Sequence, residues 1–248
     1  MKPFSTPPPF RTHVLKRSIS CLLLLLLLVI STACNSQLTG EVYLGDLDEL
    51  TPDDDLTSLV SLHLPVSGSE AEDCDEYRNR YNSVFHQSRS FKEMEYVRCY
   101  SEGSNNFAEY EFSIPLRMTD PSKGSMRGPV ELIRHDEADG QRGIYIRVDP
   151  KALDNLGDLI YDEFYQSLDL TDTAPELLLS NDLRETQTVI IEHAFVQNEP
   201  VVESRKFVLE RRDDISIVLS DVTSAWIFAK SSTLSPRYAR VATWIPSQ

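Results

Sequence analysis

An apolar run near the start of the chain, Leu22–Ile30, constrains the rest of the sequence more than any other feature. A basic segment without acidic residues precedes it, and small residues follow it, a pattern typical of a secretory signal peptide. The cations of that segment are Lys2, Arg11, Lys16 and Arg17. The run is about half of the ~20 residues that a membrane-spanning helix needs, which disfavours a retained anchor. The sequence therefore predicts a cleaved signal peptide at residues 1–33.

The residues that end this signal, Ser31-Thr32-Ala33-Cys34, resemble the lipobox of bacterial lipoproteins, in which small residues precede a lipidated cysteine. Ser31 departs from the family pattern, which most often has Leu there. The resemblance implies that Cys34 carries lipid and begins the mature protein; cleavage nearby, with Cys34 a free thiol, is the alternative. By the same resemblance Asn35 implies an outer-membrane lipoprotein facing the periplasm, while inner-membrane retention and surface exposure stay open.

The remaining cysteines, Cys74 and Cys99, form an even pair. In the oxidising compartment that a signal peptide implies, such a pair favours a disulfide, here closing a loop of about 25 residues. A two-cysteine metal site is the alternative, but it lacks His or Cys partners at ligand spacing. We predict the disulfide and expect no metal and no cofactor.

The charge balance excludes one class of partner. The net charge is −15, and loss of the four cations of residues 1–33 moves it to −19. Nucleic-acid binding needs a cluster of Lys and Arg, so we expect none. Anionic headgroups would also repel such a domain, so membrane contact is expected through the lipid alone.

Alternating apolar residues and turn signals predict strands along most of the mature chain. The strands are expected at 38–44, 60–66, 91–100, 108–116, 130–134, 144–148, 177–180, 188–196, 201–210, 215–219 and 241–245. Two main helices are expected, one after a capping-box pattern at Ser69–Glu72 and one opening at Asp149–Pro150. A short helix at 221–230 is expected to hold Trp226 against the core, and Gly45–Asp55 to form a turn or loop.

These elements predict an α+β fold with a β majority and a sandwich-like C-terminal part of antiparallel sheets. We expect a disulfide-pinned strand–helix–hairpin unit at 34–118 and a β-rich unit with one helix at 129–248. Residues 119–128, rich in Gly and Pro, are expected to be a loop or linker between them.

The lipobox, the early strand, the cysteine-pinned helix and hairpin, and the β-rich end together resemble a loosely defined family of small lipoproteins of unknown function from bacteria and their phages. The β-rich end carries the phrases that contribute to this likeness, Asn181-Asp182, Ala194–Val201 and Ile217–Val222. The resemblance covers most of the mature chain. It implies an envelope location and a mobile-element origin, and it implies no activity.

The sequence contains no catalytic signature. The histidines, which are His13, His63, His86, His135 and His193, form neither HExxH nor a cysteine–histidine metal spacing. His63 and His193 are expected to face solvent. Residues 124–128 have the wrong register for a nucleophile elbow. A carboxylate pair for glycoside cleavage stays open, because its separation is set in three dimensions.

We therefore expect a lipid-anchored envelope protein that binds or scaffolds another envelope protein. In one version it is phage- or plasmid-derived and occludes an outer-membrane receptor; in another it assists assembly or secretion. The alternative is a periplasmic hydrolase that uses a carboxylate pair. Buried carboxylates converging in a cleft would favour the hydrolase, and an apolar groove or an exposed strand edge would favour binding.

Overall fold

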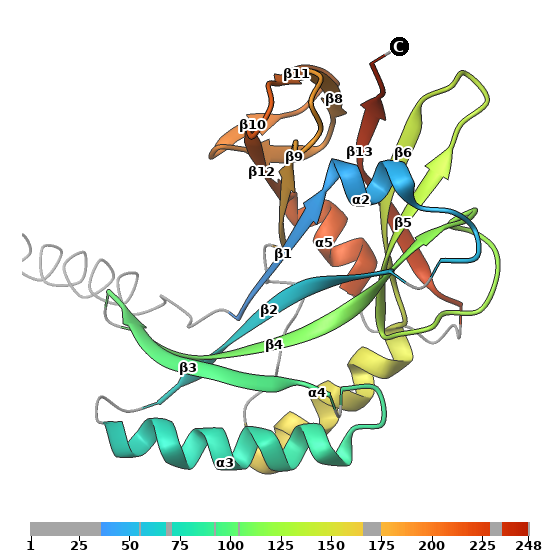
Figure 1. The fold of residues 1–248 in the computed structure, drawn as a ribbon. Coiled ribbons are helices and arrows are strands. Elements are labelled where there is room, and N and C mark those ends of the chain that lie inside the picture. Colours follow the sequence, from blue (N-terminus) through green and yellow to red (C-terminus); the bar gives the residue numbers. More distant parts are fainter. Residues whose placement is uncertain are drawn as a thin grey trace, which may run out of the picture. The chain divides into compact units, whose positions relative to one another are not determined.

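Two long neighbouring strands, β2 (Leu56–Val66) and β4 (Asn105–Met118), run through the centre of the computed structural model (Figure 1). They pair antiparallel from Leu56 opposite Leu116 to Val66 opposite Asn106. The structure describes residues 36–247, apart from 55, 68–70, 92, 104, 166–174 and 229–234, and gives no side chains for residues 71 and 72. The described body lies within one compact unit, residues 35–248.

All the described strands belong to one mixed sheet in the order β10-β9-β12-β7-β1-β2-β4-β5-β6-β13-β8-β11, with β3 also paired to β4. The other strands are β1 (Gln37–Tyr43), β3 (Glu95–Glu102), β5 (Val130–Asp136), β6 (Arg142–Val148), β7 (Glu176–Ser180), β8 (Gln187–Ile191), β9 (Ala194–Val196), β10 (Glu199–Val201), β11 (Arg205–Leu209), β12 (Asp214–Leu219) and β13 (Arg237–Ile245). Neighbours are antiparallel except for the parallel pairs β1–β7 and β4–β5. Strands dominate the regular structure, which confirms the α+β class with a β majority.

The C-terminal strands join this one sheet instead of forming a sandwich of their own. The reason is β1, which lies between β2 and β7 and so connects the two parts of the chain. β4 and β5, which flank residues 119–128, also pair directly. The units expected at 34–118 and 129–248 thus contribute strands to the same sheet.

A single bent hairpin, residues 187–209, brings the two ends of the strand order together. Its turn, Gln197–Asn198, has positive φ at both positions, as a two-residue hairpin turn requires. β8 pairs with β13, whereas β9, which begins three residues after β8 ends, pairs with β12. His193, with φ of 55°, lies at the bend, and the nearest buried side chains on either side of it are Ile191 and Ala194. The sheet therefore curls into a barrel around an apolar core.

Short helix α2 (Leu44–Glu49) lies across one end of this barrel (Figure 1). Leu44, Leu47 and Leu50 are each at most 2% exposed, because their spacing places them on one face toward the core. Buried Arg134 of β5 donates to the carbonyls of Leu47, Asp48 and Leu50 at the end of the helix. The expectation of a turn or loop throughout Gly45–Asp55 is therefore wrong.

Helix α5 (Asp221–Phe228) packs against β6 and β13. Its buried side chains are Ser224, Ile227 and Phe228, whereas Trp226 is 60% exposed. The expectation that Trp226 packs into the core is wrong. The adjacent Ile227 and Phe228 fill that role, and the indole instead lies under the Arg237 guanidinium, 5.3 Å from the ring centroid.

Helix α3 (Ala71–Gln87) covers one side of the β2–β4–β3 extension, which is the part of the sheet where β3 pairs with β4, and α4 (Pro150–Phe164) packs on α3 (Figure 1). Asp149 caps α4 by accepting from the backbone N–H of Lys151 and Ala152, which confirms the predicted start. Tyr81 of α3 contacts Phe164 at 4.4 Å between ring centroids. The capping-box pattern at Ser69–Glu72 lies largely outside the described residues.

A disulfide joins Cys74 of α3 to Cys99 of β3, consistent with the pairing expected from the sequence. It ties the first turns of the helix to the strand at the outer edge of the sheet. Within the part of the chain that the structure describes, no helix is long and apolar enough to cross a membrane.

Candidate functional site

A cleft of about 520 Å³ lies where the pairing along one edge of β4 is interrupted. β3 pairs with β4 as far as Glu111, and β5 begins to pair with it at Leu116. Residues 112–115 therefore have no strand partner on that side, although β2 pairs with them on the other. The chain segments that precede β3 and β5 form the walls of the cleft.

The floor of the cleft is apolar. Phe91, Met94 and Phe112 are each less than 10% exposed, and the two phenyl rings meet edge to face at 6.0 Å. Met94 N–H donates to the Phe91 carbonyl, so a tight turn presents both side chains to the cleft. Exposed Ser113 and half-buried Met126 lie at its margin.

The opposite wall, residues 126–129, is held close to β4. A Cβ on Gly128 would lie 3.1 Å from Pro115 Cδ, tighter than ordinary packing allows, so the close approach depends on glycine. Asp149 N–H donates to the Pro129 carbonyl at 2.8 Å, which ties this wall to the start of α4.

A buried group of charges fixes the preceding loop. Glu131 is fully buried, its Oε1 accepts from the Arg127 backbone N–H, and it lies 3.6 Å from Arg117 and 3.8 Å from Arg147. Arg147 also donates to the Lys123 and Gly124 carbonyls. The segment expected to be a loop or linker is thus an irregular loop held to the sheet by buried Arg147 and half-buried Arg117.

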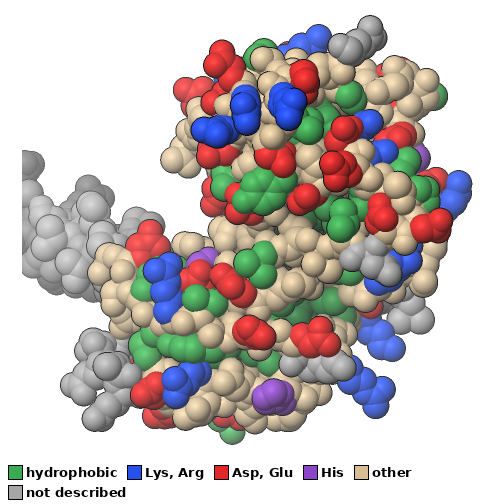
Figure 2. Space-filling view, in the orientation of Figure 1, with side chains coloured by type: hydrophobic (Ala, Val, Ile, Leu, Met, Phe, Trp, Pro, Cys, Tyr) green, Lys and Arg blue, Asp and Glu red, His purple; other side chains and the backbone are tan. Residues whose placement is uncertain are grey.

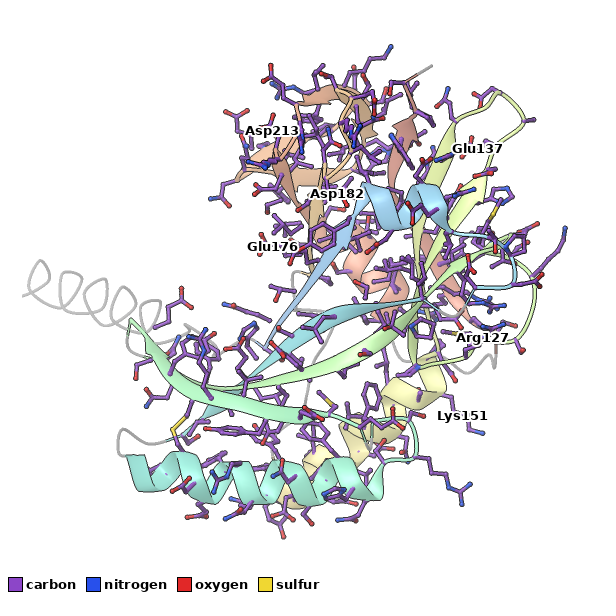
Figure 3. The ribbon with its side chains drawn as sticks, viewed as in Figure 1. Arg127, Glu137, Lys151, Glu176, Asp182 and Asp213 are labelled. Carbon is purple, nitrogen blue, oxygen red and sulfur yellow. A yellow bond between two sulfur atoms is a disulfide. The ribbon has the colours of Figure 1, made fainter. Side chains whose placement is uncertain are left out.

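Basic side chains gather at the rim of the cleft. Arg89 and Arg127 line it and are exposed. Figure 2 shows Asp and Glu over much of the face in view, with Lys and Arg at its upper left and at its lower right, and Figure 3 labels Arg127 and Lys151 at the lower right. Of the lining carboxylates, Glu93 is exposed and Asp149 already caps α4. The cleft therefore has two arginines and two carboxylates around an apolar floor.

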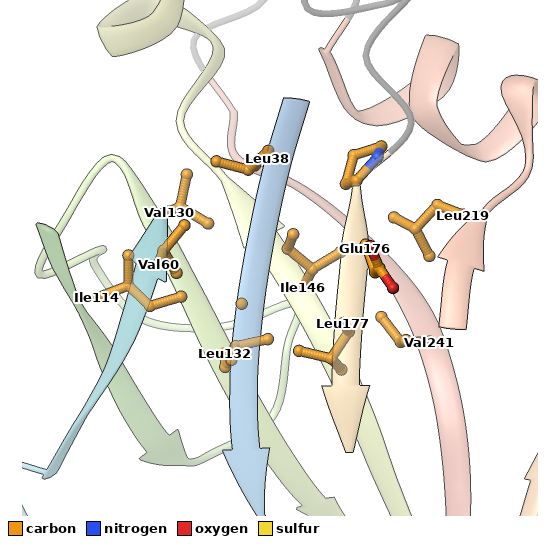
Figure 4. A pocket seen from close by; sticks show the side chains of 12 residues that line it. Leu38, Val60, Ile114, Val130, Leu132, Ile146, Glu176, Leu177, Leu219 and Val241 are labelled. Carbon is orange, nitrogen blue, oxygen red and sulfur yellow. The ribbon is translucent and has the colours of Figure 1, made fainter. Parts of the chain in front are cut away.

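The barrel interior contains a second, much smaller cavity of about 30 Å³, seen in Figure 4. Its lining is almost entirely aliphatic and includes Leu38, Val60, Leu132, Ile146, Leu177 and Val241. Glu176 borders it, but its carboxylate accepts from Ser216. A space about the size of one water molecule, with few polar partners, is a packing defect and not a ligand site.

His63 is buried at 9% exposure, so the expectation that it faces solvent is wrong. Its Nδ1 lies 3.0 Å from the Tyr100 hydroxyl and its Nε2 3.4 Å from Thr39 Oγ1. Burial lowers the pKa of His63, and the nearby Glu109 carboxylate opposes that shift. His193 is exposed, as expected. His63 does not line the cleft and forms a hydrogen-bonded group within the sheet.

The family model described as a domain of unknown function (DUF7424) matches residues 36–239. This chain belongs to that family. No curated protein and no solved structure matches it. The DUF7424 match runs from the residue before β1 into β13, so the cleft, the β2–β4–β3 extension and all of the barrel except the greater part of β13 lie within the family domain.

The cleft residues were not singled out from the sequence. Of the sites that were, Cys34 lies outside the described residues, and Cys74 and Cys99 lie together in the disulfide, away from the cleft. Arg89 and Arg127 are far apart in sequence, and neither belongs to a motif. Gly128 is the one local signal, and the sequence presents it only as part of the loop or linker expected at 119–128. Among the described residues, no group of three or more His, Cys, Asp or Glu could hold a metal ion.

Glu131→Ala should lower the free energy of unfolding by about 3–5 kcal/mol, because it leaves buried Arg147 and half-buried Arg117 without their carboxylate. Chemical denaturation measures this loss. Trypsin should also cut the folded Glu131→Ala protein after Lys123 and Arg127 faster than it cuts the unsubstituted protein, because the loop is held less firmly. Glu199→Ala, which removes an exposed ion pair with Arg205, should change stability by less than about 1 kcal/mol. Equal effects of the two substitutions would contradict the clamp.

Gly40→Ala should raise the free energy of unfolding by about 0.5–1 kcal/mol. The new Cβ would lie 3.4 Å from Val60 and 3.7 Å from Leu177, in ordinary contact beside the interior cavity. Gly143→Ala is the matched control, because its Cβ would overlap the Tyr145 ring and should destabilise by about 1–3 kcal/mol. Denaturation midpoints of the two variants that shift in the same direction would contradict this packing.

Proposed function

We propose that this protein is a lipid-anchored envelope lipoprotein whose cleft beside β4 binds another envelope component. The observation that carries the proposal is the cleft itself, an open and preformed hollow at an interrupted strand edge. Apolar floors with a few polar groups at the rim are typical of binding sites. The partner is proposed to be a receptor that the protein occludes or a component whose assembly it assists.

The rival proposal is a periplasmic hydrolase with a carboxylate pair. Such an enzyme needs two carboxyl groups facing one substrate bond across a cleft. In the cleft described above, Asp149 is engaged as a helix cap and Glu93 lies exposed on the entering loop. This arrangement supports binding over hydrolysis, and a null phenotype from a single histidine substitution would favour the enzyme instead.

The proposed location rests on the lipobox resemblance and the paired cysteines. Cys34 precedes Gln37, the first residue of β1, by three residues, so a lipid on it would hold the body within about 10 Å of the bilayer. Such an anchor is proposed to orient the protein from the end of the sheet where β1 begins.

Cys34→Ala should abolish fatty-acid labelling and release the protein from membranes into the soluble periplasmic fraction, because the lipid is the proposed anchor. Metabolic labelling and fractionation measure both. The matched control is Cys21→Ala, which changes a cysteine inside the signal and should leave labelling intact. Labelling that survives in Cys34→Ala would refute the anchor.

A photo-crosslinking amino acid at Ser113, exposed at the cleft, should capture a discrete envelope protein in intact cells. The same probe at Ser204, exposed between β10 and β11, serves as the control and should not capture that protein. Mass spectrometry identifies the product. Identical products from both positions, or none from Ser113 with the protein folded and abundant, would argue against binding through the cleft.

A further inference from the structure

We infer that the face of β3, β4 and β2 opposite helix α3 docks a cationic segment of a protein partner, with a Lys or Arg side chain of that partner between Glu95 and Glu111. The residues that carry this inference are Glu95, Glu111, Ser61 and Leu59, and none of them lines the cleft. The inference therefore goes beyond the proposed binding through the cleft and does not depend on it.

Strand alternation places the two carboxylates on the face away from α3. Tyr96 and Tyr110 lie opposite each other on β3 and β4, and Tyr110 contacts Tyr81 of α3, so these tyrosines point toward the helix (Figure 1). Successive side chains of a strand point to opposite faces. Glu95 and Glu111 each precede or follow one of these tyrosines by one residue, so they point away from the helix.

Glu95 and Glu111 form a pair of like charges. Each is the register partner of the other across β3 and β4. Side chains that are directly opposite have Cβ atoms about 4.5–5.5 Å apart, and like charges there are destabilising. A cation bound between the two carboxylates would remove this repulsion.

The chain supplies no such cation from its described residues. Arg98, the one cation in β3, already binds Glu109, with Nε 2.5 Å from the carboxylate oxygen. Within the part of the chain that the structure describes, neither Glu95 nor Glu111 has an ion pair or a side-chain hydrogen bond. The two carboxylates are thus available to a cation from another molecule.

The strands beyond β4 continue this charge bias. The six consecutive strands β10, β9, β12, β7, β1 and β2 contain no Lys or Arg, whereas β5, β6, β11 and β13 each contain arginine. Net charge anywhere on the surface would serve solubility. The separation of charge between two sides of one sheet instead gives this side complementarity to a basic partner.

Apolar and hydroxyl side chains accompany the carboxylates. Ser61 is the register partner of Glu111, and Leu59, two residues along β2 on the same face, is 52% exposed. The register row then crosses β1, β7, β12 and β9 through Thr39, Glu176, Val218 and Phe195. From β3 to β9 this row covers six strand spacings, about 29 Å. A surface of this length suits a protein segment.

The donor set selects an organic cation. Two carboxylates and one hydroxyl fall short of the six to eight oxygen ligands that Ca²⁺ takes. A guanidinium has five N–H donors in a planar fork and can bind carboxylates on more than one side. The aliphatic stems of Lys and Arg pack on apolar side chains, a role that exposed Leu59 can fill here.

The test begins with panning of the purified protein against phage-displayed random peptides, with the Glu95→Lys variant as the counter-selection. Enriched sequences should contain Lys or Arg beside an apolar residue. A fluorescent synthetic copy of one enriched peptide then gives affinities by anisotropy. Glu95→Lys should weaken its binding about tenfold or more, and Glu111→Gln should weaken it as well. High salt should weaken binding to the unsubstituted protein.

The stability of the same variants gives a second measurement. Glu95→Lys replaces a repulsive cross-strand pair with an attractive one, so its thermal unfolding midpoint should rise while its binding falls. The matched control is Glu203→Lys, the same charge reversal at an exposed residue between β10 and β11. It should leave both the unfolding midpoint and the peptide affinity close to those of the unsubstituted protein.

Three results would overturn the inference. The first is equal loss of affinity in Glu95→Lys and Glu203→Lys, which would show attraction to the net charge alone. The second is a library that yields no enriched peptide, or enriched peptides without Lys or Arg. The third is a lower unfolding midpoint in folded Glu95→Lys. Each of these results leaves the cleft proposal standing, because the Ser113 crosslink tests that proposal with different residues.

Discussion

The antiparallel pairing of β2 with β4 is the interaction on which both parts of the fold depend. One portion of this pair joins the barrel through β1 and β5, and the other carries β3 under α3. β4 is longer than either strand on its second edge, so two strands share that edge and neither covers residues 112–115. The cleft is thus a direct consequence of how the backbone groups of one long strand are partnered.

Arginines that are buried or half-buried give this cleft a defined shape. Arg147 and Arg117 hold the loop that leads to one wall, and Glu131 supplies the opposing charge beneath it. Arg134 does the same for α2 at the end of the barrel. Buried charges are costly unless their partners are in place, so these contacts favour one arrangement of each loop. A preformed cleft loses less entropy when a partner binds.

Short-range signals predicted much of the fold. Alternation along Val60, Leu62 and Leu64 predicted β2, and Asp149–Pro150 predicted the start of α4, because both depend on neighbouring residues. The same reasoning missed α2, whose single turn is stabilised by Arg134 from a distant strand. The same reasoning also gave the wrong burial for Trp226 and His63. The alternation of apolar and polar residues does not say which face of an element another part of the chain covers.

The sequence by itself determined most of the strand and helix segments and the acidic balance of the chain. Only the tertiary structure decided that β1 lies beside β7, that one bent hairpin closes the barrel, and that Arg89 and Arg127 share a cleft. The physical reason is that side-chain patterns set which face of a strand is buried, whereas its neighbours are chosen by the packing of the whole chain.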